Sequence, residues 1–216
     1  MDLIKVVVDL GLPSGTLWCK YNLEAYPELD PHPFASDFYG NYYSWGETKV
    51  KNEYSYDTLT FCDDERKLTK YCEKDGLTQL LPEDDVAYIK QKCRNFKFHI
   101  PTKEQVEELL KYTTISWTEN QKINGKIVKD LNGVTFISKI NGNSLFFPAA
   151  GYMTGDSTIH EKIDGGIWTS TNAFGQDDIV DYNKAYFLFF DLELRLAYID
   201  IDYRGKGLNI RPVTNP

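Results

Sequence analysis

The second half of the chain consists of short apolar segments separated by glycines, and this punctuation constrains the fold more than any other feature. Strands are short and end at turn residues, whereas helices need an apolar stripe of longer period. Asn141-Gly142 lies between two of the segments and predicts a β-hairpin, because both residues readily take positive φ. Strands are predicted at residues 115–118, 133–138, 144–148, 167–171, 185–191, 195–200 and 208–213.

Two helices are predicted ahead of these strands. Pro82 is followed by three acidic residues, which suit the first turn and the positive end of a helix, so we expect helix from there to about Cys93. Thr102 and Gln105 form a capping-box pattern in front of an apolar stripe, and the helix that follows is expected to end near Tyr112.

The first part of the chain is mostly loop-like. Strands are expected at residues 5–10 and 16–20, joined by a reversal that contains Gly and Pro. Residues 21–66 hold several prolines and glycines around the aromatic run Tyr42-Tyr43-Ser44-Trp45. A structureless segment of this length is unusual inside one domain, so we expect its aromatic side chains to pin it to the core.

Charge and hydropathy exclude two classes of partner. The net charge is −8 and the isoelectric point is near 5.0, and no cluster of Lys and Arg makes a local basic patch, so we expect no nucleic-acid binding. The longest apolar runs, such as residues 185–190, are far shorter than the about 20 residues of a membrane span, so we expect no membrane insertion.

The domain organisation and the cysteines are simple. No repeat, linker or low-complexity tract divides the chain, so we expect a single domain over residues 1–216. The N-terminus lacks the apolar run of an export signal, and we expect no leader. Widely spaced cysteines without a Cys-x-x-Cys pair favour free thiols over disulfides. These residues are Cys19, Cys62, Cys72 and Cys93.

Motifs along nearly the whole chain resemble those of the Fibrobacter succinogenes major paralogous domain family. Their joint order is far more specific than any one of them. The segments are Val8-Asp9-Leu10-Gly11-Leu12-Pro13-Ser14-Gly15-Thr16-Leu17-Trp18, Tyr42-Tyr43-Ser44-Trp45-Gly46-Glu47-Thr48, Leu68-Thr69-Lys70-Tyr71-Cys72, Leu81-Pro82-Glu83-Asp84-Asp85, Ile100-Pro101-Thr102 with Glu104, Phe147-Pro148-Ala149-Ala150-Gly151-Tyr152, Ile167-Trp168-Thr169-Ser170-Thr171 and Asn209-Ile210-Arg211-Pro212-Val213.

The resemblance implies an α+β fold of the C-type-lectin-like kind, which formylglycine-generating enzymes share. Two helices, a mainly antiparallel sheet, long irregular loops and adjacent N- and C-terminal strands are then expected. Members of this family are usually surface proteins of gut bacteria or proteins encoded by their phages. The lack of a leader favours a virion part assembled in the host cytoplasm, such as a capsid decoration, head-fibre or tail-associated protein. The alternative is a ligand-binding or adhesin domain at the bacterial cell surface.

Neither catalysis nor a metal is expected. Formylglycine-generating enzymes use a cysteine pair in the C-terminal half, but every cysteine here lies at or before Cys93, so this third alternative ranks last. The histidines are scattered, and the Glu-Pro-Asn, Gln-Pro-Asp and Trp-Asn-Asp tripeptides of calcium-dependent lectins do not occur. Asp177, Asp178 and Asp181 crowd one loop, which we interpret as solvated and not as a calcium site. No cofactor is expected.

The late loops are the predicted binding face, while the four tryptophans are expected in the core. The partner is expected to be another virion structural protein, or a glycan or protein of the host surface, and an oligomer is left open. Aromatic residues and Arg anchor interfaces, and acids orient them. The candidate contact residues are Asn172, Phe174, Gln176, Asp177, Asp178, Asp181, Tyr198, Asp200, Tyr203 and Arg204.

Overall fold

Strands dominate the protein. The computed structural model describes residues 6–25, 27, 33–90, 92–93, 96–175 and 179–215, with residues 92–93 described by their backbone alone. Among the described residues 41% are in strands and 12% in helices, and the strands form several small sheets that are not closed. The expectation of an α+β fold of the C-type-lectin-like kind is therefore wrong, because the described part of the chain is mostly β.

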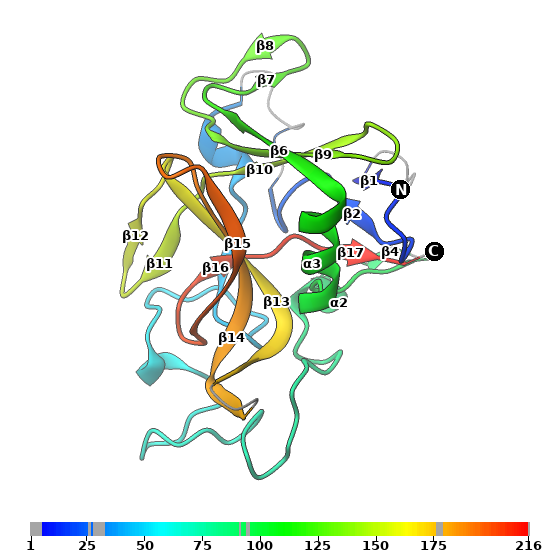
Figure 1. Ribbon diagram of the computed structural model, residues 1–216. Helices are drawn as coiled ribbons and strands as arrows, with labels where there is room; N and C mark the ends of the chain where they lie inside the picture. Colours follow the sequence, from blue (N-terminus) through cyan, green and yellow to red (C-terminus); the bar gives the residue numbers. More distant parts are fainter. Residues whose placement is uncertain are drawn as a thin grey trace.

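The largest sheet has five strands and runs through the centre of the molecule (Figure 1). Its order is β15 (Leu196–Tyr203), β14 (Val180–Asp191), β13 (Asp164–Phe174), β16 (Leu208–Asn209) and β3 (Tyr42–Tyr43). The three long strands are antiparallel neighbours, and β16 runs parallel to β13. β15 forms one edge of this sheet. The strands predicted at 167–171, 185–191 and 195–200 are confirmed, each longer than expected.

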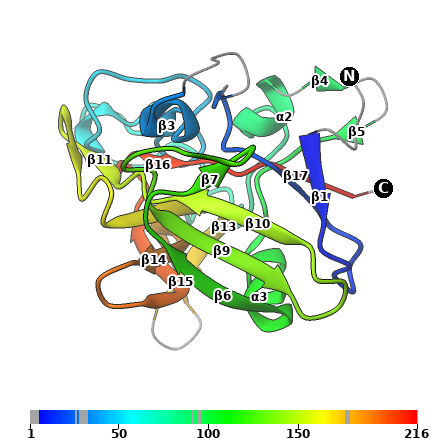
Figure 2. The ribbon, with the colours of Figure 1, turned by 90° about the horizontal axis from the view of Figure 1, so that it is seen from above.

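A second sheet of three strands crosses above the first and has the order β10-β9-β6 (Figures 1 and 2). It consists of β6 (Thr113–Thr118), β9 (Gly133–Ser138) and β10 (Ser144–Pro148). The turn between β9 and β10 contains Gly142 at φ +78°, a conformation that glycine adopts without strain. The hairpin predicted from Asn141-Gly142 is confirmed, with both strands at the expected bounds.

The helix α3 (Lys103–Tyr112) packs against strands of both sheets. The Thr102 hydroxyl accepts a hydrogen bond from the Gln105 backbone N–H, and the Gln105 side chain accepts one from the Thr102 N–H. This reciprocal pair satisfies two donors at the helix start. The predicted capping box and the predicted end at Tyr112 are confirmed.

The earlier helix is shorter than the sequence suggests. α2 spans Val86–Lys90 and does not start near Pro82. The Asp85 carboxylate accepts hydrogen bonds from the backbone N–H groups of Ala87 and Tyr88, which places the cap at Asp85. Burial raises the pKa of Asp85, although backbone hydrogen bonds oppose the shift.

The N-terminal hairpin joins the end of the chain in a third sheet. Its order is β1 (Val7–Asp9), β2 (Leu17–Cys19) and β17 (Val213–Thr214), all on one side of the molecule (Figure 1). The expected direct neighbourhood of the first and last strands is not found, since β2 lies between them. Buried Arg211 closes this region by donating to the carbonyl oxygens of Cys19, Lys20 and Phe146 over 2.7–3.1 Å.

The remaining elements are short. The β7–β8 hairpin turns through Asn124 at φ 51° and Gly125 at φ 81°, the pattern of a type I′ turn. No described helix is long and apolar enough to cross a membrane. These elements are β4 (Lys92–Cys93), β5 (Phe96–Lys97), β7 (Lys122–Ile123), β8 (Lys126–Ile127), β11 (Tyr152–Thr154), β12 (Ser157–Ile159) and the 3₁₀ turns η2 (Ala35–Phe38) and η3 (Tyr56–Thr58).

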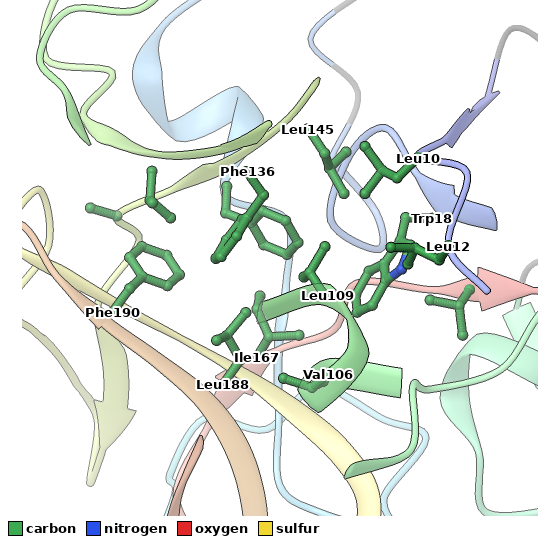
Figure 3. Close-up of a cluster of buried hydrophobic side chains, with 14 residues drawn as sticks. Leu10, Leu12, Trp18, Val106, Leu109, Phe136, Leu145, Ile167, Leu188 and Phe190 are labelled. Atoms are coloured by element: carbon green, nitrogen blue, oxygen red, sulfur yellow. The ribbon is translucent and has the colours of Figure 1, made fainter. Parts of the chain in front are cut away.

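The main core lies where α3 meets the two larger sheets and the N-terminal hairpin (Figure 3). It joins Val106 and Leu109 of α3, Phe136 of β9, and Leu188 and Phe190 of β14. A second cluster lies on the opposite face of the five-stranded sheet, around Trp168 and Phe187. Each face of this sheet is thus covered over part of its area.

The long segment 21–66 is held by its aromatic residues, as predicted. Tyr43, Trp45 and Tyr54 are buried, and the Trp45 indole donates to the Thr169 carbonyl oxygen over 2.7 Å. Trp18, Trp45 and Trp168 lie in the core as expected. Trp117 is only partly buried and packs at the margin of the main core.

Candidate functional site

A groove opens on the face of the five-stranded sheet that is turned away from α3. Its volume is about 260 Å³, and aromatic and charged side chains line it. We call this cavity the sheet groove. Its lining residues are Tyr152, His160, Asp164, Gly165, Gly166, Phe187, Phe189, Tyr198, Asp200, Asp202, Lys206 and Leu208.

Strand periodicity places the groove residues on one face. Phe189 is the register partner of Tyr198, and Phe187 is the partner of Asp200. Successive side chains of a strand alternate between faces, so residues two apart share a face. On β13 the partner of Phe189 is Gly166. A Cβ atom at Gly166 would lie 2.9 Å from Leu208 Cδ2, so this glycine keeps the floor of the groove open.

The hairpin β11–β12 forms one wall. The Gly151 N–H donates to the Asp164 carbonyl oxygen over 2.8 Å. Met153 and Gly207 exchange backbone hydrogen bonds of 2.8 and 2.9 Å. A Cβ at Gly207 would lie 2.6 Å from the Tyr54 ring, so only glycine allows this close approach. These contacts hold Tyr152 opposite the strand that carries Tyr198.

His160 and Asp164 form a hydrogen-bonded pair in the lining of the groove, with His160 exposed and Asp164 buried. His160 Nδ1 lies 2.8 Å from Asp164 Oδ2. The His160 backbone is left-handed at φ 58°, and its carbonyl oxygen accepts hydrogen bonds from the N–H groups of Ile163 and Asp164. A left-handed conformation is uncommon for a residue other than glycine, and such strain concentrates at functional sites.

The carboxylate of Asp164 is almost fully buried, yet only one of its two oxygens has a hydrogen-bond partner among the described residues. The residue is 3% exposed, and its Oδ1 atom is buried with no hydrogen-bond partner among the described residues. Burial raises the pKa of Asp164, and the hydrogen bond from His160 partly offsets the shift. An unpaired acceptor at this depth is costly, so its persistence needs a reason.

A row of aromatic rings leads from the core to the surface at the groove. Neighbouring rings meet edge to face, with centroids 5.8 Å apart for Trp168 and Phe187, 6.1 Å for Phe187 and Phe189, and 5.5 Å for Phe189 and Tyr198. Tyr198 is 41% exposed at the outer end. The row gives the groove rigid walls, because each ring is held by its neighbour.

Lys206 already places an ammonium group in the groove. Its Nζ lies 4.0 Å from the centroid of the Tyr152 ring, and it also pairs with the Asp202 carboxylate. The combination of an aromatic face and a carboxylate is a favourable environment for a cation. The groove chemistry can therefore hold an ammonium group.

The groove contains an excess of negative charge. Asp164, Asp200 and Asp202 face one lysine, Lys206, besides His160. Asp200 uses one oxygen to accept a 2.9 Å hydrogen bond from the Ile201 N–H, and no cation pairs with it among the described residues. Asp164 and Asp200 thus each keep one oxygen that no described donor contacts, whereas both oxygens of Asp202 are engaged, one by the Tyr203 N–H and the other by Lys206.

The predicted binding residues lie in different environments. Tyr198 and Asp200 line the groove. Phe174 is 38% exposed and Tyr203 57% exposed, both away from the groove lining. Asp181 pairs with Lys184 over 3.6 Å. The predicted contacts Gln176, Asp177 and Asp178 lie outside the described residues.

Arg204 is not a surface anchor, contrary to expectation. The residue is 0% exposed and its guanidinium donates to the carbonyl oxygens of Tyr71 and Tyr182 over 3.0 and 3.1 Å. It also lies 4.8 Å from the centroid of the Trp45 ring. Arg204 therefore fixes the early loops to the end of β15, and it cannot contact a partner.

Asn172 is also a structural residue and not a contact. It is 0% exposed, and its backbone N–H donates to the Thr78 carbonyl oxygen over 2.9 Å. Its side-chain amide donates to the Lys184 carbonyl oxygen over 3.3 Å. The strand end that carries Asn172 is thus covered by the segment near Thr78.

Sequence reasoning missed the larger part of the groove. Lys206 and Asp202 were not singled out, although Asp202 lies two residues after Asp200 and therefore on the same face of the strand. Phe187 and Phe189 were not singled out either. His160 and Tyr152 come from a separate hairpin, and the only local signal is the His160–Asp164 spacing of four residues.

Another cavity, also of about 260 Å³, lies between β10, the β7–β8 turn and the segment near Tyr21. Phe146 and Leu145 contribute its apolar floor, and Arg211 reaches it from the interior. The Arg211 guanidinium is committed to carbonyl oxygens that hold the chain together. We therefore place recognition in the sheet groove, where Asp164 and Asp200 each keep one oxygen that no described donor contacts.

Metal and thiol chemistry find little support. Within the part of the chain that the structure describes, no three His, Cys, Asp or Glu residues are grouped so that they could hold a metal ion. Cys62 and Cys72 are free thiols, as predicted. Burial raises the pKa of the Cys62 thiol, which disfavours the reactive thiolate. The side chain of Cys93 is outside the described residues.

Comparisons with known proteins give no match. No protein-family model matches the chain, and neither a curated protein nor a solved structure matches it. The resemblance to the Fibrobacter succinogenes major paralogous domain family therefore stays a prediction from the motifs.

Proposed function

We propose that this protein is a non-catalytic binding protein that attaches to a partner through the sheet groove, as a component of a phage virion. One observation carries the binding role. The groove combines rigid aromatic walls with the half-engaged carboxylate of Asp164, which is buried at 3% exposure. Rigid rings and a few convergent polar groups are typical of recognition sites.

The rim of the groove suits a macromolecular partner. Tyr198 is 41% exposed, and Leu194 and Leu196 at the preceding turn are 65% and 46% exposed. Large exposed apolar side chains that gather beside a pocket mark interaction surfaces. The partner is then a protein surface that covers β15 and inserts one group into the groove.

The virion setting rests on the motifs that resemble the Fibrobacter succinogenes major paralogous domain family. Members encoded by phages supply the precedent for a capsid decoration, head-fibre or tail-associated role. The proposed partner is accordingly another virion structural protein, with a host-surface ligand as the alternative outcome.

Quantitative mass spectrometry of purified particles tests the proposal. Particles are banded on a density gradient, and the chain is measured against the major capsid protein with labelled peptides. We expect a fixed ratio for the unmodified chain and a strong reduction for the double variant Tyr198→Ala, Asp200→Asn. Glu73→Gln, an exposed acid outside the groove, serves as the charge-matched control and should leave the ratio unchanged.

Two outcomes would contradict the proposal. Absence of the chain from particles would remove the virion setting, and recovery in the cell envelope would favour the bacterial surface. Equal incorporation of the folded double variant and the unmodified chain would show that the groove is not the attachment site.

A further inference from the structure

We propose that the sheet groove binds the ammonium end of a lysine side chain that the partner protein presents. This inference rests on the proposed binding function and names the group that the groove recognises. Four observations carry it: the charge of the groove, the state of its carboxylates, its aromatic faces and its size.

The charge of the groove calls for a cation. Three aspartates face Lys206 and His160, so negative charge stays in excess even when His160 is protonated. A neutral sugar could accept and donate hydrogen bonds there, but it would leave this excess uncompensated. A cation removes it, and complementary charge also steers the approach of the partner.

The carboxylates favour an ammonium over a guanidinium. One oxygen each of Asp164 and Asp200 already accepts a hydrogen bond, which leaves one open oxygen on each, while both oxygens of Asp202 are engaged. A guanidinium binds best when both oxygens of one carboxylate are open to its planar fork, whereas an ammonium has three donors that rotate independently. Separate single acceptors therefore match the ammonium.

Asp164 supplies the deepest of these acceptors. Its Oδ1 atom is buried without a partner among the described residues, and the residue lines the groove. A donor that enters the groove and displaces the atoms covering this oxygen would satisfy it. The buried, charged hydrogen bond so formed is stronger than a neutral one.

The aromatic faces provide the second half of the site. The ammonium group of Lys206 lies over the Tyr152 ring, with Nζ 4.0 Å from the ring centroid. This contact shows how an ammonium group can lie against an aromatic ring in this groove. No described cation lies over Phe189 or Tyr198, although both rings line the same cavity. An incoming alkylammonium can therefore use these two rings for its apolar stem and its charge.

The size of the groove selects a side chain over a whole ligand. A volume of about 260 Å³ is below the range of roughly 300–1,000 Å³ that is usual for drug-sized ligands. One lysine side chain fits this limit. The exposed apolar rim at Leu194 and Leu196 then contacts the protein surface from which the lysine projects.

Titration of the full-length protein with Nα-acetyl-lysine methylamide, followed by two-dimensional amide NMR, tests the inference. We expect shifts confined to the groove, at Tyr198, Lys206 and His160. The Nε-acetylated probe, which is neutral, should bind at least about 5-fold more weakly, because hydrogen bonds to charged groups contribute most. The arginine analogue should also bind more weakly.

Single variants distinguish a loss of charge in the groove from a loss of the folded structure. Asp200→Asn should weaken the lysine probe by about 5-fold or more, whereas Glu73→Gln should not change it. Asp200 is preferred to Asp164 for this purpose because it is half-buried and its removal leaves the fold intact, which the NMR spectrum itself verifies.

Several results would overturn the inference. These are equal binding of the neutral probe, tighter binding of the arginine analogue, no groove shifts with the lysine probe, or groove shifts caused by Ca²⁺ alone. Each of them leaves the particle experiment unaffected. If the groove variants still fail to join particles, the binding function stands and only the identity of the bound group is wrong.

Discussion

The two faces of the five-stranded sheet are built from alternate residues of the same strands, yet one packs in the main core and the other lines the sheet groove. Leu188 and Phe190 point toward α3 and are 0% exposed in the main core. Phe187 and Phe189 point the other way and line the sheet groove beside Tyr198. The face toward α3 is apolar where the helix covers it, while the other face mixes rings with carboxylates.

This contrast shows how a strand can separate stability from recognition. Adjacent residues on β14 differ by one position but face different surroundings, because side chains alternate along a strand. The face against α3 gains free energy from apolar burial. The groove face keeps a buried, half-engaged carboxylate that contributes nothing obvious to folding and is available for a partner.

The largest expected effect is on the core face. Leu188→Ala should lower the free energy of unfolding by about 2–5 kcal/mol, because it leaves a cavity among packed side chains. Urea denaturation followed by tryptophan fluorescence measures this loss. A loss below about 1 kcal/mol would show that the two faces do not differ in the way described.

A smaller effect on stability is expected on the groove face. Tyr198→Ala removes the edge-to-face contact with Phe189 at 5.5 Å and should lower the free energy of unfolding by about 1 kcal/mol. The same variant should lose most of the lysine-probe affinity. If instead it were as destabilising as Leu188→Ala with binding unchanged, the groove face would be a second core and not a recognition surface.

The smallest effect concerns the pH dependence of Asp164. Burial raises its folded pKa above the unfolded value of about 3.8, so the unfolded state ionises first as the pH rises. The free energy of unfolding of the wild type therefore falls as the pH rises from the unfolded pKa to the folded pKa of Asp164. At higher pH it stays lower by the same amount. Asp164→Asn lacks this loss, so its stability relative to wild type should increase as the pH rises through the window.

Unfolding curves of both proteins from pH 3 to neutral pH check this expectation. His160, Asp191 and Lys206 also act on the Asp164 carboxylate, so the acidic part of the range, where carboxylates titrate, is the informative one. A relative stability of Asp164→Asn that falls with rising pH would mean that His160 favours the ionised carboxylate more than burial disfavours it.

Much of the fold could be predicted where local signals decide the structure. The β9–β10 hairpin follows from Asn141-Gly142, and α3 follows from the Thr102 cap. α2 was misplaced because a side chain decides its start: Asp85 captures the N–H groups that Pro82 and its acids were expected to organise. The fold class was wrong because strand content depends on pairing between distant segments, which motifs do not report.

The groove could be predicted only in part. Tyr198 and Asp200 were named, but Arg204 was expected to be a contact because it follows Tyr203 in the late loops and Arg often anchors interfaces, whereas it is buried. Its burial depends on the carbonyl oxygens of Tyr71 and Tyr182, which lie far away in sequence. His160 and Tyr152 reach the groove through β11–β12, and no local pattern indicates that this hairpin packs beside β15.

The pairing of β17 with β2 has a consequence for synthesis. Val213 is the register partner of Trp18, and Arg211 ties the same region to carbonyl oxygens of the N-terminal hairpin. The hairpin leaves the ribosome long before its third strand has been translated. Trp18 must therefore stay without its final neighbours until Val213 has left the ribosome, so this sheet closes late in synthesis and its apolar strands stay open to chaperones until then.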